Sequence, residues 1–255
     1  MPFSAISVSR SPAIGRVPSL LKINRPEKAN ALDTATVAGL HAAVLDAVAD
    51  GKPFALASDG EVFCGGFDFT GIERESAGDL LLRFARIELL LQTVSSTPVV
   101  SFALLNGAAF GAGADLAAAC AYRIGTPRAK FRFPGFRFGV ALGTRRLTNI
   151  VGTDRARAIL LEDRTLSAKE AVEVGLLTHL VDEPELIPTV ERLTIQHEGL
   201  SRNATGNVLR LTGVDTNDAD LADLVRSLSP SGLHERIACY RAGHGRLAAI
   251  RGNSD

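Results

Sequence analysis

The sequence has little that would mark a nucleic-acid binder, a secreted protein or a membrane protein. Its 255 residues carry 28 basic and 28 acidic side chains, so the formal charge is zero, whereas phosphate binding needs a basic surplus. Only three cysteines occur (Cys64, Cys120 and Cys239), with no CxxC pair, which favours a reducing, cytoplasmic location. The longest apolar stretch, about 99–114, is shorter than the roughly 20 residues of a membrane span, and no secretory signal is expected.

Several motifs of cofactor and catalytic sites are also missing. There is no GK[ST] of a Walker loop and no GxSxG of a serine nucleophile. Gly111 and Gly113 begin a GxGxxG dinucleotide fingerprint, but Leu116 stands where the third glycine belongs, which leaves a Rossmann-type oxidoreductase as one alternative. The five histidines are scattered without metal-ligand spacing, and we expect no metal.

What is present is the pattern of a packed α/β protein. Apolar residues make up 46% of the chain and charged residues 22%, and short apolar runs alternate with helical periodicity. Because parallel strands need helical crossovers, this alternation predicts a partly parallel sheet. Strands are predicted at about 6–8, 17–23, 54–57, 99–105 and 131–133, and helices at about 34–49, 80–94, 114–121, 145–161, 168–174 and 184–196.

Two glycine turns follow predicted strands, one in Phe63–Asp68 and one in Asn106–Asp115. Glycine lets the backbone turn tightly and lets a ligand approach bare N–H groups. Both turns are equally compatible with simple chain reversals in a packed protein. Cys64, in the first turn, is interpreted as a small buried thiol rather than a nucleophile.

Four sequence blocks resemble the crotonase, or enoyl-CoA hydratase/isomerase, superfamily. Leu21–Leu32 (LKINRPEKANAL) is similar to its first-strand signature NRPxxxNAL, and Val62–Asp68 to its F[SC]AGxD turn. The segment from Thr97 to Asp115 is similar to KPxxAxxxGxAxGGGxE, and the segment from Ser167 to Val181 to SAxEAxxxGLVxxVV. The blocks occur in the family's order and cover most of the chain.

The resemblance implies a spiral of ββα units, residues 1–200, that binds the acyl-CoA, and a C-terminal helical region, residues 201–255, that faces other subunits. It implies a homotrimer or dimer of trimers, an acyl-CoA thioester substrate, and no cofactor apart from the coenzyme A of the substrate. The backbone N–H groups of Phe67 and Ala112 would hold the thioester oxygen as it becomes an enolate. By position, the resemblance also assigns substrate or CoA contacts to Lys28, Ala29, Asp68, Phe69, Gly111 and Gly135.

The sequence departs from the family's hydratases at both catalytic carboxylates. Hydratases use two glutamates; Asp115 stands at the first position, and Gly135, which has no side chain, stands at the second. Because a positioned acid or base contributes about 10²–10⁴-fold, we expect one-base chemistry such as double-bond isomerisation, decarboxylation or thioester hydrolysis rather than efficient hydration. Two alternatives remain open: Asp115 instead caps the helix beside it, and the protein is a weak or inactive acyl-CoA-binding paralogue.

The basic side chains near these motifs have more than one interpretation. Arg132 and Arg137 lie in an aromatic stretch, with phenylalanines at 131, 133, 136 and 138 that would share one face of a strand. Each arginine either binds a substrate carboxylate, pairs with an acid of the protein or faces solvent. Likewise, Arg25 and Lys28 either meet CoA phosphates or are solvated surface charges.

Overall fold

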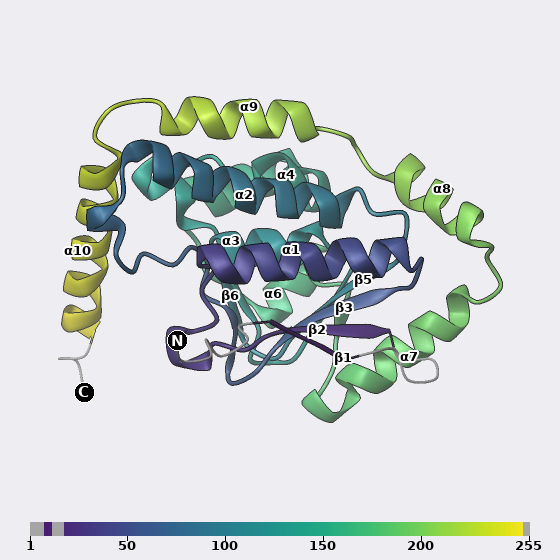
Figure 1. Ribbon diagram of the computed structural model, residues 1–255. Helices are drawn as coiled ribbons and strands as arrows, with labels where there is room; N and C mark the ends of the chain where they lie inside the picture. The colour runs from purple at the N-terminus through teal and green to yellow at the C-terminus, as the bar shows by residue number, and fades with distance from the viewer. Residues whose placement is uncertain (1–7, 12–17, 252–255) are drawn as a thin grey trace, which may run out of the picture.

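The computed structural model describes residues 8–11 and 18–251, with side chains described for residues 9 and 18–243. In this part of the chain, two sheets are covered by helices (Figure 1). The larger has six strands in the order β1-β2-β3-β5-β7-β10, and the smaller has four in the order β4-β6-β8-β9. The strands are β1 (Val8–Ser11), β2 (Ser19–Ile23), β3 (Phe54–Ser58), β4 (Val62–Cys64), β5 (Ser101–Leu105), β6 (Ala108–Phe110), β7 (Tyr122–Gly125), β8 (Lys130–Arg132), β9 (Leu166–Ser167) and β10 (His179–Leu180).

The chain repeats one topological unit. Each unit places one strand in the large sheet, the next strand in the small sheet, and then a helix: β3-β4-α2, β5-β6-α3 and β7-β8-α4. Successive units pair in parallel, β3 with β5 with β7 and β4 with β6 with β8. The predicted spiral of ββα units with a helical C-terminal region is therefore confirmed.

The helices are α1 (Thr34–Ala49), α2 (Ala77–Ser95), α3 (Ala112–Ala119), α4 (Thr144–Val151), α5 (Thr153–Leu161), α6 (Ala168–Glu173), α7 (Leu186–His197), α8 (Arg202–Thr212), α9 (Asn217–Leu228) and α10 (Leu233–Arg251). Short 3-10 turns are η1 (Pro26–Lys28), η2 (Ile72–Arg74), η3 (Pro134–Phe138) and η4 (Glu183–Glu185). Among the residues described, no helix is both long enough and apolar enough to cross a membrane.

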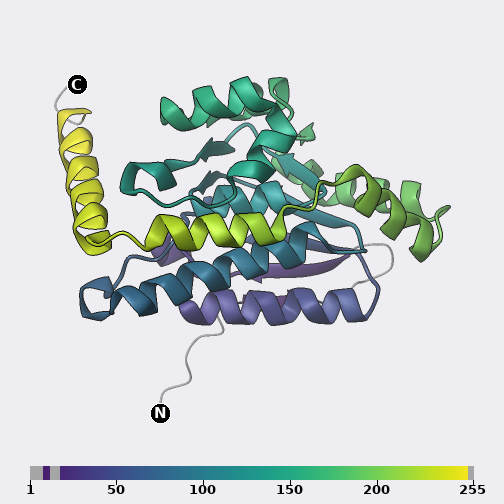
Figure 2. The same cartoon turned by 90° about the horizontal axis from the view of Figure 1, so that it is seen from above.

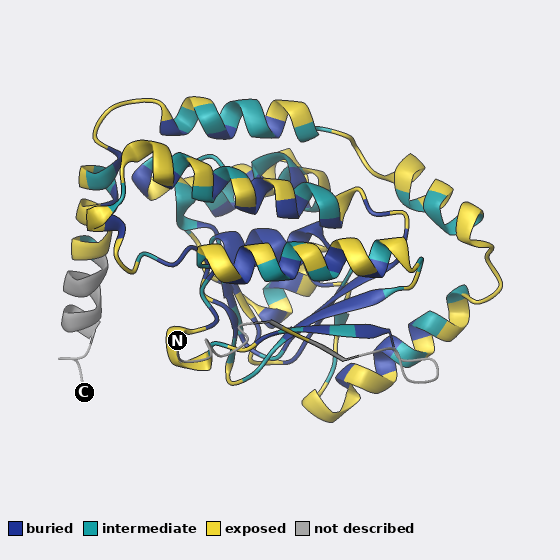
Figure 3. Cartoon of the chain, in the orientation of Figure 1, coloured by how far each residue is buried: buried dark blue, intermediate teal, exposed yellow. Residues whose placement is uncertain are grey.

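Local sequence signals account for where the long helices begin. The Asp33 side chain accepts a hydrogen bond from the Thr36 N–H and caps α1. Ser76 and Asp79 form a reciprocal capping box that starts α2. Both helices bury one face and expose the other (Figure 3), because their apolar residues recur at helical spacing.

Two predictions about helices and strands need correction, and a third falls partly on residues that the structure does not describe. The single helix predicted over 145–161 is two helices, α4 and α5, which meet at Gly152 with φ +84°. The predicted strand of alternating phenylalanines ends at Arg132, and the following residues form η3, so Phe136 is exposed while Phe138 is buried. Residues 6, 7 and 17 of the first two predicted strands lie outside the described residues.

The C-terminal helices surround the spiral rather than forming a layer of their own. Helix α9 lies along the outer side of α2, and α10 stands at one end of the molecule (Figures 1 and 2). There α10 packs against η3. This placement brings the last described helix to the functional site.

Candidate active site

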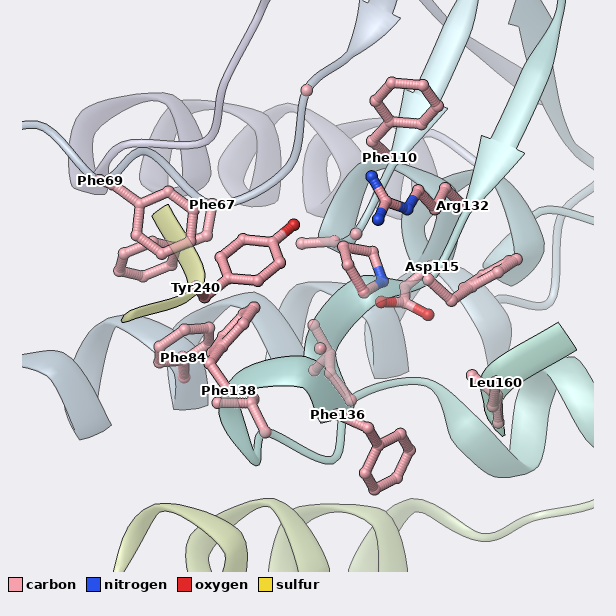
Figure 4. A pocket seen from close by; sticks show the side chains of 18 residues that line it. Phe67, Phe69, Phe84, Phe110, Asp115, Arg132, Phe136, Phe138, Leu160 and Tyr240 are labelled. Carbon is pink, nitrogen blue, oxygen red and sulfur yellow. The ribbon is translucent and has the colours of Figure 1, made fainter. Parts of the chain in front are cut away.

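A cavity of about 210 Å³ lies where the two glycine turns, β8, η3 and α10 meet (Figure 4). The lining is mostly aromatic and aliphatic, with only Asp115, Arg132 and Tyr240 supplying polar side-chain groups. The lining residues are Gly65, Phe67, Phe69, Phe84, Phe110, Gly111, Ala112, Asp115, Arg132, Phe133, Pro134, Gly135, Phe136, Phe138, Val140, Leu142, Leu160 and Tyr240.

The two glycine turns lie side by side at this cavity. Strands β4 and β6, which precede them, pair in parallel with Cys64 opposite Ala109. A Cβ on Gly66 would lie 2.6 Å from the Phe110 carbonyl oxygen and 3.3 Å from the Ala112 amide nitrogen, so only glycine permits this approach. The backbone next to Phe67 therefore lies close to the backbone at Ala112.

The Phe67 and Ala112 amides are available to a ligand. Within the described residues, neither N–H donates to a backbone or side-chain acceptor. Around Phe67, the parallel bridge to Leu32 uses the Gly66 carbonyl and the Asp68 N–H instead. Ala112 is the first residue of α3, where helix N–H groups lack intrahelical partners and the dipole favours negative charge. Two such donors could stabilise a developing oxyanion, and one is typically worth about 3 kcal/mol of transition-state stabilisation.

Asp115 lines the cavity and does not cap its helix. The N-cap of α3 is Gly111, with no side-chain cap, and Asp115 lies one turn further on with 4% of its surface exposed. Its carboxylate packs directly against Gly143. Burial raises the pKa of this carboxyl well above its ordinary value; the positive charge of Arg146 opposes that rise, and the negative charge of Glu88 adds to it.

Gly135 has no room for a side chain. A Cβ there would lie 2.7 Å from the carbonyl oxygen of Val140, and the Val140 N–H donates to the Gly135 carbonyl at 2.9 Å. The tight turn of η3 therefore requires glycine at the position where the resemblance expects a glutamate. Asp115 is the single carboxyl among the lining residues.

The structure separates the predicted site residues into two groups. Phe67, Phe69, Gly111, Ala112, Asp115 and Gly135 all line the cavity. Lys28 and Asp68 instead lie in a neighbouring shallow depression that also contains Arg25. Ala29 lines neither, although its carbonyl accepts a hydrogen bond from the Gly65 N–H and so supports the first turn.

Comparison with known proteins identifies the family of the chain. The family model described as enoyl-CoA hydratase/isomerase matches residues 18–203, well over half of the chain. This protein belongs to the enoyl-CoA hydratase/isomerase, or crotonase, family.

Two curated relatives and one solved structure illustrate the similarity. A "probable enoyl-CoA hydratase" of Mycobacterium tuberculosis is 33% identical over 199 residues, 74% of this chain and 79% of the relative. The crotonyl-CoA hydratase of Syntrophomonas wolfei is 29% identical over 218 residues, 83% of this chain and 82% of the relative. A crystal structure from Bordetella parapertussis, assigned to the same family, has 38% identity and a TM-score of 0.90 over 93% of this chain and 99% of that chain.

The arginines near the site of this family member pair with the protein's own acids. Arg132 binds Asp163 through two hydrogen bonds of 2.9 and 2.5 Å, and Arg137 reaches the same carboxylate at 3.1 Å. Arg25 forms ion pairs with Asp33 and Asp68. For Arg132 and Arg137, these contacts match the alternative of pairing with protein acids. The ion pairs of Arg25 were not among the alternatives expected for it.

Several features of the site had no signal in the sequence. Tyr240 comes from α10, more than a hundred residues after Gly135, and Phe84 comes from the inner face of α2. The packing of α10 on η3 brings Tyr240 to the cavity, and stacking on Phe67 brings Phe84 there. The interpretation of Cys64 is confirmed: the thiol is fully buried, and burial raises its pKa to about 12.

Proposed function

We propose that this protein acts on an acyl-CoA thioester through an enolate, with Asp115 as the acid–base group, and shifts a carbon–carbon double bond. The observation that carries the proposal is that one buried carboxyl and the two residues with unpaired amides line the same cavity, with no second carboxyl in its lining. Hydration needs water to be activated on one side and a proton delivered on the other, which one carboxyl performs poorly.

The reaction follows from the groups present. The thioester oxygen accepts hydrogen bonds from the Phe67 and Ala112 amides, which stabilise the charge that develops on it. The ionised Asp115 removes a proton from C2 of a 3-enoyl thioester, and the electrons move through the C2–C1 bond onto that oxygen. The same carboxyl returns the proton at C4 as the enolate collapses, which leaves a 2-enoyl thioester.

The surroundings of Asp115 suit a single proton carrier. Because burial raises its pKa, the ionised carboxylate is a stronger base than an exposed aspartate, and it retains the proton between the two transfers. The apolar lining gives the proton few other acceptors. A binding paralogue without turnover is the competing hypothesis, because the second catalytic carboxylate is missing.

The deciding experiment is incubation of the protein with 2-enoyl-, 3-enoyl- and saturated acyl-CoAs in D₂O, followed by mass spectrometry. We expect deuterium uptake and double-bond migration without water addition. Hydration at ordinary enzyme rates would contradict the one-base mechanism. Binding without any product would favour the paralogue, and release of free CoA would indicate thioester hydrolysis.

We also propose a trimer or dimer of trimers that uses the 201–255 region. Helix α8 and the residues after it expose Val208, Leu211 and Val214, with 51%, 69% and 65% of their surfaces accessible. Neighbouring apolar side chains exposed in this way often mark a protein interface. Sedimentation velocity should give trimers or larger assemblies for the wild type and smaller species for Leu211→Glu.

The three cysteines are free thiols, which supports the proposed cytoplasmic location.

A further inference from the structure

The cavity concentrates the aromatic side chains of a chain that has few. Phenylalanine and tyrosine number 12 and 2 in the whole sequence, and eight of them line this one cavity. Neither the reaction proposed above nor the oxyanion contacts require these rings. We therefore look for the reason for this concentration of rings in the kind of ligand that the cavity binds.

Five of the rings gather at one end of the cavity, away from Asp115 (Figure 4). Phe67 and Phe84 stack with ring centroids 4.2 Å apart, and the guanidinium carbon of Arg83 lies 4.2 Å from the Phe67 centroid. These contacts hold Phe67, whose own amide belongs to the oxyanion site, in one orientation.

The other three rings, Phe69, Phe138 and Tyr240, face one another at tilted or edge-on angles. Their centroids are 4.9 to 6.5 Å apart, and they come from the first glycine turn, η3 and α10. Tilted and edge-to-face pairs at these distances are the arrangement that aromatic rings prefer. A planar ring placed beside them would meet both ring edges and ring faces.

A flexible alkyl chain would gain less from the same walls. It has no π-system to meet the ring edges, and it loses rotational freedom at every bond that becomes fixed, whereas an aryl group is already rigid. We therefore propose that the acyl group of the substrate carries an aromatic ring, which binds against Phe69, Phe138 and Tyr240. This inference rests on the proposed function, because it assigns the acyl part of the same thioester.

The test compares phenylacetyl-CoA with octanoyl-CoA, which have the same number of acyl carbons, by isothermal titration calorimetry. We expect phenylacetyl-CoA to bind about tenfold more tightly, which is the size of effect given by one or two aromatic contacts. In the double variant Phe138→Leu/Tyr240→Leu, the two ligands should bind within about twofold of each other.

A matched control separates ring contacts from general loosening of the protein. Phe102 is fully buried, stacks on Tyr122 and does not line the cavity, so Phe102→Leu removes a ring elsewhere and should keep the preference. Equal binding of both ligands to the wild type, or a preference that survives the double variant, would overturn the inference.

A second readout distinguishes this failure from failure of the proposed function. Octanoyl-CoA should exchange its C2 hydrogens in D₂O whether or not the aromatic preference exists. Exchange without preference would refute only the aromatic acyl group. If neither thioester binds and neither exchanges, the proposed function fails, and the inference fails with it.

Discussion

The guanidinium of Arg146 donates two hydrogen bonds to the carboxylate of Glu88, at 2.5 and 3.0 Å, between α4 and α2. Glu88 is 1% exposed and Arg146 8%, and Asp220 of α9 lies 3.6 Å from the same guanidinium. Both members of this buried pair act on the pKa of Asp115, in opposite directions. The ion pair thus connects α2 and α4 to the environment of Asp115, the proposed acid–base group.

Removing one member of this pair should destabilise the fold strongly. Arg146→Met leaves the Glu88 charge buried without its partner, which typically costs about 3–5 kcal/mol of unfolding free energy. The double variant Glu88→Leu/Arg146→Met removes both charges and should recover most of that loss. Urea unfolding of the wild type and the two variants measures this, and equal losses in the single and double variants would contradict it.

Substitution of Asp115 should stop proton transfer and leave the binding of thioesters intact. Asp115→Asn keeps the size of the side chain and removes the base, so C2 deuterium exchange should fall by about 10²–10⁴-fold. The dissociation constant of a saturated acyl-CoA, measured by calorimetry, should change little, because the proposed oxyanion donors are backbone groups. Exchange at wild-type rates in this variant would assign the base to another residue.

The buried Asp115 should also make stability depend on pH. Its folded pKa is raised, so between about 3.9, the ordinary unfolded value, and the folded pKa the native protein holds a proton that the unfolded chain has lost. The stability that comes from Asp115 is therefore full below about pH 4 and is lost as pH rises through the folded pKa.

Asp115→Asn isolates this contribution, because every other carboxyl is shared with the wild type. We expect the unfolding free energy of the variant, relative to wild type, to increase as pH rises above about 4 and to level off once the pH passes the folded pKa of Asp115, in urea titrations between about pH 4.5 and 8. A difference that stays constant over this range would show that Asp115 has no raised pKa.

Restoring a glutamate at position 135 should not create a hydratase. A Cβ there would crowd the Val140 carbonyl, so Gly135→Glu should lose about 1–3 kcal/mol of stability, as overpacked sites do. Gly135→Ala is the control: it should lose a similar amount although it adds no carboxyl. Water addition to a 2-enoyl-CoA by Gly135→Glu at ordinary enzyme rates would show that η3 rearranges readily.

Much of the fold was predictable because its signals are local. Helical periodicity and the Asp33 cap place α1 at its observed bounds, and the alternation of strands and helices indicates the parallel sheets. The break between α4 and α5 was missed, because both helices have helical periodicity and only the backbone at Gly152 separates them. The strand predicted from the phenylalanines was wrong beyond Arg132, because Phe133 and Phe136 are three residues apart and this spacing interrupts the alternation of a strand.

For the site, the sequence by itself determined which residues are available: two glycine turns, one aspartate at position 115 and no glutamate at position 135. Tertiary structure decided that Asp115 faces the cavity instead of capping α3, that Arg132 and Arg137 share Asp163, and that Tyr240 closes the aromatic end. The physical reason is that these outcomes depend on contacts between segments far apart in the chain. Such contacts form only when packing brings the segments together, and no local pattern encodes them.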